Sequence, residues 1–219
     1  MEKGSPATLV AAINEQRRIQ GMFPDVTEDE IIRYFGPSLP KILERFFPEQ
    51  DTKILAKLVG DLAVEYTPQM MQPREGALRV LNELYTRGHL NYVLSSADGY
   101  DVQRQASILG LSPYLHGVHT FLLNGNSSVG SVEEFKAGVM INTGLIGVQI
   151  NYGVTPESLV LVGDTETDMR AAERAKKMIV SDSRFRDVRV HGVLFDPNLR
   201  NTRIKTEYRL RTLGDILYV

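Results

Sequence analysis

The hydrophobic pattern of the chain changes its period near residue 73. Before that point, apolar residues such as Leu9 and Ile13 recur at helical spacing, and no strand pattern is convincing. Thr27 and Glu30 form a capping box, which predicts a helix that begins there and ends at Gly36. Two more amphipathic helices are expected, over residues 40–47 and 51–66. The first third of the chain is therefore expected to be helical.

Beyond a linker predicted at Pro68 and Pro73, helical segments alternate with short apolar runs of strand length. Helices are expected over residues 74–87, 101–109, 133–152 and 168–177, and strands over residues 90–94, 117–122, 158–162 and 178–180. This alternation is typical of a parallel sheet covered by helices. We expect an α/β fold with a Rossmann-like parallel sheet core over residues 73–219 and a small α-helical cap domain over residues 1–72.

The amino-acid composition argues against several classes of protein, including nucleic-acid-binding and membrane-spanning proteins. The 219 residues carry 25 Lys and Arg against 27 Asp and Glu, a net charge of −2, so there is no basic excess for a nucleic acid. No apolar run approaches the roughly 18 residues needed to span a bilayer. The absence of Cys excludes disulfides, thiolate catalysis and Cys-ligated zinc. It also fits a reducing compartment, and we expect a cytoplasmic protein without nucleic-acid or membrane partners.

Candidate chemistry is expected where strands end, because parallel sheets bind ligands at their carboxyl ends. After the run at residues 158–162, Gly163 allows a tight turn, and Asp164 and Asp168 place two carboxylates four residues apart. Such oxygens suit Mg²⁺, which takes one or two carboxylates and keeps waters. The alternative is that both residues only cap the next helix. From these residues alone, the two interpretations are about equally supported.

Two further residues are compatible with phosphate binding. Ser95 follows a predicted strand, where its hydroxyl could bind a phosphate oxygen, although an ordinary turn explains it as well. Lys136 lies early in a helix, against the helix dipole, so a partner anion would explain it; a solvated surface lysine is the alternative.

The order of Ser95, Lys136 and the Gly163 to Asp168 turn resembles that of the haloacid dehalogenase-like hydrolases, and within them the phosphoglycolate phosphatase-like group with a helical cap. The resemblance spans nearly the whole chain. It implies an Mg²⁺-dependent phosphatase acting on a small phosphorylated metabolite. It further implies that Ser95 and Lys136 hold phosphoryl oxygens, that Asp164 binds Mg²⁺ and that Asp168 orients it.

One departure from this family concerns the nucleophile. The family begins with a central strand that ends in Asp-x-Asp-x-Thr, and that motif occurs nowhere in the 219 residues. The first residues, up to Pro6, resemble the stretch just after it. We therefore expect a sheet that lacks the first strand, weak Mg²⁺ binding and little or no turnover. The alternative is a non-catalytic relative that binds an anion or a partner protein, and a gap in the sheet makes a homo-oligomer plausible.

Overall fold

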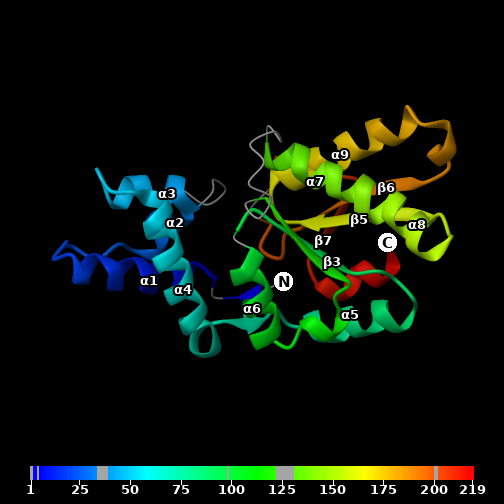
Figure 1. The fold of residues 1–219 in the computed structure, drawn as a ribbon. Coiled ribbons are helices and arrows are strands. Elements are labelled where there is room, and N and C mark those ends of the chain that lie inside the picture. The colour runs from blue at the N-terminus through cyan, green and yellow to red at the C-terminus, as the bar shows by residue number, and fades with distance from the viewer. Residues whose placement is uncertain (1, 4, 34–38, 98, 122–130, 200–201) are drawn as a thin grey trace. The chain divides into compact units, whose positions relative to one another are not determined.

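The computed structural model describes residues 2–3, 5–33, 39–97, 99–121, 131–199 and 202–219 (Figure 1). The chain divides into two compact units, one made of Met1–Leu81 with Asn91–Asn124 and the other of Asn82–Leu90 with Gly125–Val219. Within the described residues, parallel strands and helices alternate from β3 onward, so the fold is α/β with Rossmann-like parallel pairing, as predicted. The division into a cap and a core at residue 72 stays a prediction.

Four helices lie in the described part of residues 5–70, and two of them begin at a capping residue. They are α1 (Ser5–Ile19), α2 (Glu28–Arg33), α3 (Leu39–Phe46) and α4 (Thr52–Met70). The capping box at Thr27 is confirmed, because the Thr27 backbone N–H donates to the Glu30 carboxylate at 2.8 Å and the Thr27 hydroxyl accepts from the Glu30 N–H at 3.3 Å. Asp51 is the N-cap of α4, and its carboxylate accepts from the Lys53 and Ile54 N–H groups at 2.9 and 3.4 Å. The predicted end of α2 at Gly36 lies outside the described residues.

The four helices share one apolar core. α4 packs against α1 and α3, and fully buried side chains from several segments meet there: Ile13, Ile31, Leu43, Phe47 and Val59. Burying a side chain of this size contributes about 1.5–3 kcal/mol, so packing rather than helix propensity stabilises these short helices.

The linker prediction at Pro68 is wrong, because α4 continues through it to Met70. Proline has no N–H, and its ring clashes with the preceding turn, which usually ends a helix. Here Pro68 lies in the last turn, and the Met71 N–H still donates to the Thr67 carbonyl at 2.9 Å. Thr67 is fully buried, and its hydroxyl donates to the Ala63 carbonyl at 3.1 Å. Buried contacts on both sides of the proline therefore carry the helix two residues further.

The strands of the first unit form two small sheets. β1 (Glu2–Lys3) pairs antiparallel with β2 (Gln72–Pro73), which joins the two ends of the helical segment. β3 (Tyr92–Ser95) pairs parallel with β4 (Gly117–Thr120), in a register that places Ser95 opposite Thr120. The connection between them is α6 (Gly99–Ile108) and a short 3-10 turn, η1 (Ser112–Tyr114). α5 (Ala77–Thr86) precedes β3, in the region where a helix over residues 74–87 was predicted. Gly88 follows it with a left-handed backbone conformation, which is typical of the residue after a helix end.

The second unit is a three-stranded parallel sheet with helices on it. Its strands are β5 (Ser158–Gly163), β6 (Arg189–Phe195) and β7 (Tyr208–Leu210), in that spatial order. The long helix predicted over residues 133–152 is present as α7 (Val132–Ile141), a π-helical stretch η2 (Asn142–Gly147) and α8 (Val148–Tyr152). α9 (Glu166–Val180) contacts β5, β6 and α7, so α7 and α9 lie together over this sheet (Figure 1). Short 3-10 turns, η3 (Ser183–Phe185) and η4 (Leu213–Tyr218), complete the unit.

The strand predicted at residues 178–180 is wrong, because these residues form the last turn of α9. Ile179 continues the buried stripe of Ala171, Ala172 and Ala175 at helical spacing, so its apolar character serves the helix. A short apolar run satisfies either period, and only its packing partner decides between them. The strand that follows α9 is β6 instead, which begins at Arg189, nine residues after α9 ends at Val180.

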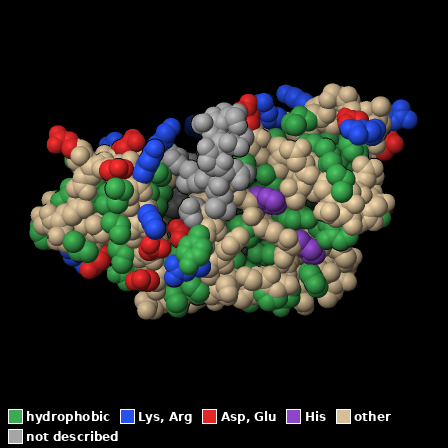
Figure 2. Space-filling view, in the orientation of Figure 1, with side chains coloured by type: hydrophobic (Ala, Val, Ile, Leu, Met, Phe, Trp, Pro, Cys, Tyr) green, Lys and Arg blue, Asp and Glu red, His purple; other side chains and the backbone are tan. Residues whose placement is uncertain are grey.

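No helix among the described residues is long and apolar enough to cross a membrane. On the face shown in Figure 2, acidic and basic side chains are intermixed, in keeping with the net charge of −2.

Candidate functional site

The turn between β5 and α9 carries the most ordered polar cluster of the second unit. Thr165 is the N-cap of α9, and its hydroxyl accepts from the Asp168 N–H at 3.3 Å. In return, the Asp168 carboxylate accepts from the Thr165 N–H at 3.2 Å and from the Thr165 hydroxyl at 2.6 Å. The helix start is thus closed by a reciprocal capping box, whose carboxylate also favours the positive end of the helix dipole. The prediction that Asp168 lies in the first turn of this helix is confirmed.

Gly163 is required by the close approach of this carboxylate. A methyl group at Gly163 would overlap the Cβ and carboxyl carbon of Asp168, which itself is 4% exposed. Because a residue inside a capped helix start cannot move far, the turn accommodates only a hydrogen at this position. The glycine was predicted for its conformational freedom, but the structure shows that close contact is the reason for it.

Lys136 reaches the same cluster from α7. Its ammonium donates to Oδ1 of Asp168 at 2.5 Å, across 32 positions of sequence, and the two side chains are only 13% and 6% exposed. The partner anion expected for a lysine early in a helix is therefore Asp168. A buried ion pair holds together only if its geometry is good and the remaining polar atoms are bonded, which the Thr165 contacts provide for Asp168.

Asp164 differs from Asp168 in its surroundings. Asp164 follows β5 directly and its side chain is exposed, whereas Asp168 is buried and accepts hydrogen bonds from Lys136 and Thr165. Among the described residues, no three His, Cys, Asp or Glu side chains gather as a metal-binding group. Hard oxygen donors suit Mg²⁺, so Asp164 fits as one ligand, and waters or a phosphate would have to complete the octahedron.

Ser95 ends β3 in the first unit. Its hydroxyl oxygen accepts from the Ala97 N–H at 3.1 Å, and its carbonyl accepts from the Phe121 N–H at 3.0 Å. The side chain is half-buried. This is the turn that the ordinary explanation predicted, yet the hydroxyl proton stays available for an acceptor. Its convergence with Lys136 and Asp164 stays a prediction, because those residues belong to the second unit.

Thr165 is the functional residue that sequence reasoning missed. The Thr-x-x-Asp spacing of Thr165 and Asp168 is the same kind of signal that located the cap at Thr27, so it could have been found.

Burial lowers the pKa of His119, whose ring packs beside that of Tyr92 with centroids 5.8 Å apart. Alternation along β4 places His119 on the opposite face of the sheet from Thr120 and Ser95, so this histidine is not part of the site.

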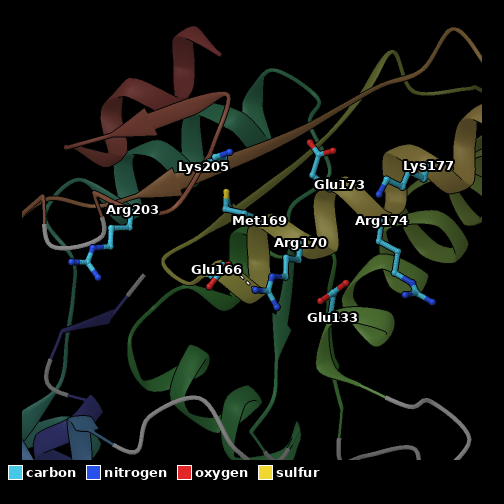
Figure 3. Close-up of a pocket in the computed structure, with 9 residues that line it drawn as sticks. All are labelled: Glu133, Glu166, Met169, Arg170, Glu173, Arg174, Lys177, Arg203 and Lys205. Carbon is cyan, nitrogen blue, oxygen red and sulfur yellow. Dashed lines mark hydrogen bonds and ion pairs between the residues drawn. The ribbon is translucent and has the colours of Figure 1, made fainter.

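A hollow of about 500 Å³ lies elsewhere on the second unit, along α9 (Figure 3). Five basic and three acidic side chains line it, and none of them is a predicted site residue. Arg170 pairs with Glu166 at 2.7 Å, and Arg174 pairs with Glu134 of α7 at 2.7 Å. Basic side chains outnumber acidic ones in the lining, and Glu134, the partner of Arg174, is not part of it.

The chain is similar to known proteins in both sequence and structure. Residues 5–124, more than half of the chain, match the haloacid dehalogenase-like hydrolase family. A predicted phosphoglycolate phosphatase from Haemophilus somnus is similar in structure, with a TM-score of 0.72, 16% identity, and coverage of 98% of this chain and 91% of that one. A haloacid dehalogenase-like hydrolase from Streptococcus pneumoniae is also similar, with a TM-score of 0.67, 13% identity, and coverage of 98% and 90%.

A third similar structure, from Bacillus subtilis, is described as a hydrolase of this family bound to magnesium, with a TM-score of 0.64, 12% identity, and coverage of 98% and 91%. No curated protein matches the chain. At these identities the solved structures establish the fold. The chain belongs to the haloacid dehalogenase-like hydrolase family, which confirms the family resemblance drawn from the sequence.

Proposed function

We propose that this chain provides the phosphate- and Mg²⁺-binding part of a phosphatase that acts on a small phosphate monoester. The observation that carries the proposal is the buried pair of Lys136 and Asp168 on the turn that presents Asp164. An ammonium has three donors, and among the described residues one of them goes to Asp168; the proposal assigns the others to phosphoryl oxygens. Asp168 is then a positioning residue, which holds the lysine and the helix start in one arrangement.

Ser95 and Asp164 complete the proposed set. The Ser95 hydroxyl donates to a phosphoryl oxygen, and Asp164 supplies a carboxylate ligand to Mg²⁺. When bound, Mg²⁺ supplies positive charge to the phosphoryl oxygens. Two similar structures support this assignment, since one is named as a phosphoglycolate phosphatase and another as bound to magnesium.

The described site has no phosphoryl acceptor. Lys136 and Ser95 serve the phosphate oxygens, Asp168 is hydrogen-bonded through both of its oxygens, and Asp164 serves the metal. The Asp-x-Asp-x-Thr motif that supplies the acceptor in this family is absent from the 219 residues. The second candidate is a relative that binds an anion without turning it over.

Binding is the first test. We expect inorganic phosphate to bind the chain in an Mg²⁺-dependent manner, as measured by ³¹P NMR titration, and we expect Asp164→Asn to weaken it about tenfold. A hydrogen bond or contact to a charged group contributes about 1.5–3 kcal/mol, which corresponds to this change or more. Asp187→Asn is the matched control, because it removes another exposed carboxylate, in the turn before β6. Equal affinity of both variants and the unaltered chain would contradict the assignment of Asp164.

Hydrolysis of a phosphate monoester distinguishes the two proposed functions, a phosphatase and a relative that only binds an anion. With Mg²⁺ present, we expect the 219 residues to hydrolyse p-nitrophenyl phosphate and phosphoglycolate no faster than background, because no acceptor is held at attack distance. The measurement is phosphate release over hours at substrate concentrations that saturate binding. Clear turnover that Asp164→Asn abolishes would show that the chain contains a nucleophile other than those considered.

A further inference from the structure

Thr120 is a buried residue with an unsatisfied hydroxyl at the end of β4. It is 2% exposed, and its Oγ1 has no hydrogen-bond partner in the part of the chain that the structure describes. Leaving a buried hydroxyl unpaired costs about 1–3 kcal/mol. Valine fits a buried strand position equally well without that cost, so the hydroxyl calls for an explanation.

The neighbour of Thr120 across the sheet is Ser95. The two residues are paired in register at the last position of β3 and β4. Paired residues on adjacent strands lie about 4.8 Å apart and point to the same face of the sheet. The methyl and hydroxyl of a threonine are nearly equal in size, so rotation about χ1 can turn the Thr120 hydroxyl toward Ser95 within the same space.

The hydroxyl oxygen of Ser95 can accept a hydrogen bond from the Thr120 hydroxyl. Among the described residues, the Ser95 oxygen accepts from the Ala97 N–H at 3.1 Å. A serine oxygen has two acceptor positions and one proton. If Thr120 donates to the second acceptor position, both lone pairs of Ser95 are occupied, and the Ser95 proton must point away from the two strands. That orientation leaves the Ser95 hydroxyl as a donor only.

We propose that Thr120 is a positioning residue: its hydroxyl donates to Ser95 and thereby aligns the Ser95 proton toward a phosphate oxygen. The inference rests on the proposed function, because it needs Ser95 to bind phosphate. It assigns a role to a residue of the neighbouring strand that sequence spacing does not connect to the site. Ordered hydrogen bonds of this kind also polarise one another, which strengthens the last donor in the series.

The test is a double-mutant cycle read by Mg²⁺-dependent binding of inorganic phosphate in ³¹P NMR, with thermal unfolding measured alongside. Thr120→Val keeps the shape and removes the hydroxyl. We expect it to weaken phosphate binding about five- to tenfold, the size of one lost hydrogen bond, while the melting temperature stays equal or rises. Thr120→Ser should restore binding. In a Ser95→Ala background, Thr120→Val should have no further effect.

The remaining outcomes are distinct. If Ser95→Ala weakens binding but Thr120→Val does not, the inference is overturned and the proposed function stands. If Thr120→Val weakens binding equally with and without Ser95, Thr120 acts independently and the positioning role is wrong. If Ser95→Ala binds phosphate normally, the role of Ser95 in the proposed function fails, and the inference fails with it.

Discussion

Asp168→Ala is expected to lower the free energy of unfolding by about 3–5 kcal/mol, the cost of leaving a buried charge without its partner. Lys136 is 13% exposed and donates to Asp168, so its ammonium would stay behind with little access to water. The same substitution removes the carboxylate that closes the capping box with Thr165. Urea unfolding of the second unit, followed by circular dichroism, measures the change.

Two comparisons isolate the buried pair. Glu166→Ala breaks the ion pair between Glu166 and Arg170, which lie one turn apart on α9 and have side chains that are 61% and 62% exposed. The loss of this exposed pair should lower the free energy of unfolding by less than about 1 kcal/mol. Adding Lys136→Met to Asp168→Ala should recover part of the loss, because an apolar side chain does not need a buried partner. A cost for Asp168→Ala as small as that for Glu166→Ala would show that the pair is solvated.

Gly163→Ala is expected to destabilise the chain by about 2–4 kcal/mol, through overpacking and loss of the helix cap. The added methyl group would overlap Asp168 near its backbone, so rotation of the side chain alone cannot relieve it. Asp168 would have to leave Thr165 and Lys136. Thermal unfolding gives the stability, and the ¹⁵N chemical shift of the Lys136 ammonium reports whether its contact with Asp168 persists.

Gly138→Ala is the matched control for this substitution. Gly138 lies inside α7, two residues from Lys136, and apart from its chain neighbours and the nearby backbone of its own helix, no described atom lies within 4 Å of a methyl group added there. In an open helix interior, alanine is more stable than glycine by about 0.5–1 kcal/mol. The two glycine variants should therefore change stability in opposite directions. A stabilising Gly163→Ala would show that the turn is looser than the structure indicates.

The position of each site residue could be predicted from local pattern, but their contacts could not. The helix start at Asp168 and the end of a strand at Ser95 follow from periodicity and turn chemistry, and a lysine against a helix dipole indicated an anion. That the anion is Asp168 depends on the packing of α7 against α9. The separation of 32 residues carries no signal of that contact in one sequence.

The errors in the fold have the same origin. Residues 178–180 and Pro68 each satisfy a rule of local structure, and tertiary contacts overrode both, because buried neighbours continue the helix in each case. Thr120 was not singled out, since a threonine in a strand is ordinary. Its burial and its register with Ser95 exist only once β3 and β4 have paired.

The antiparallel pairing of β1 with β2 has a consequence for how such a chain can diversify. Glu2–Lys3 and Gln72–Pro73 hold the entrance and the exit of the helical segment side by side, and neighbouring strands lie about 4.8 Å apart. A segment whose two ends meet can be lengthened, shortened or exchanged without displacing the residues on either side of it. β1 and β2 thus keep the start of α1 and the end of α4 together, so a change in the length of these helices need not disturb the pairing of Glu2–Lys3 with Gln72–Pro73.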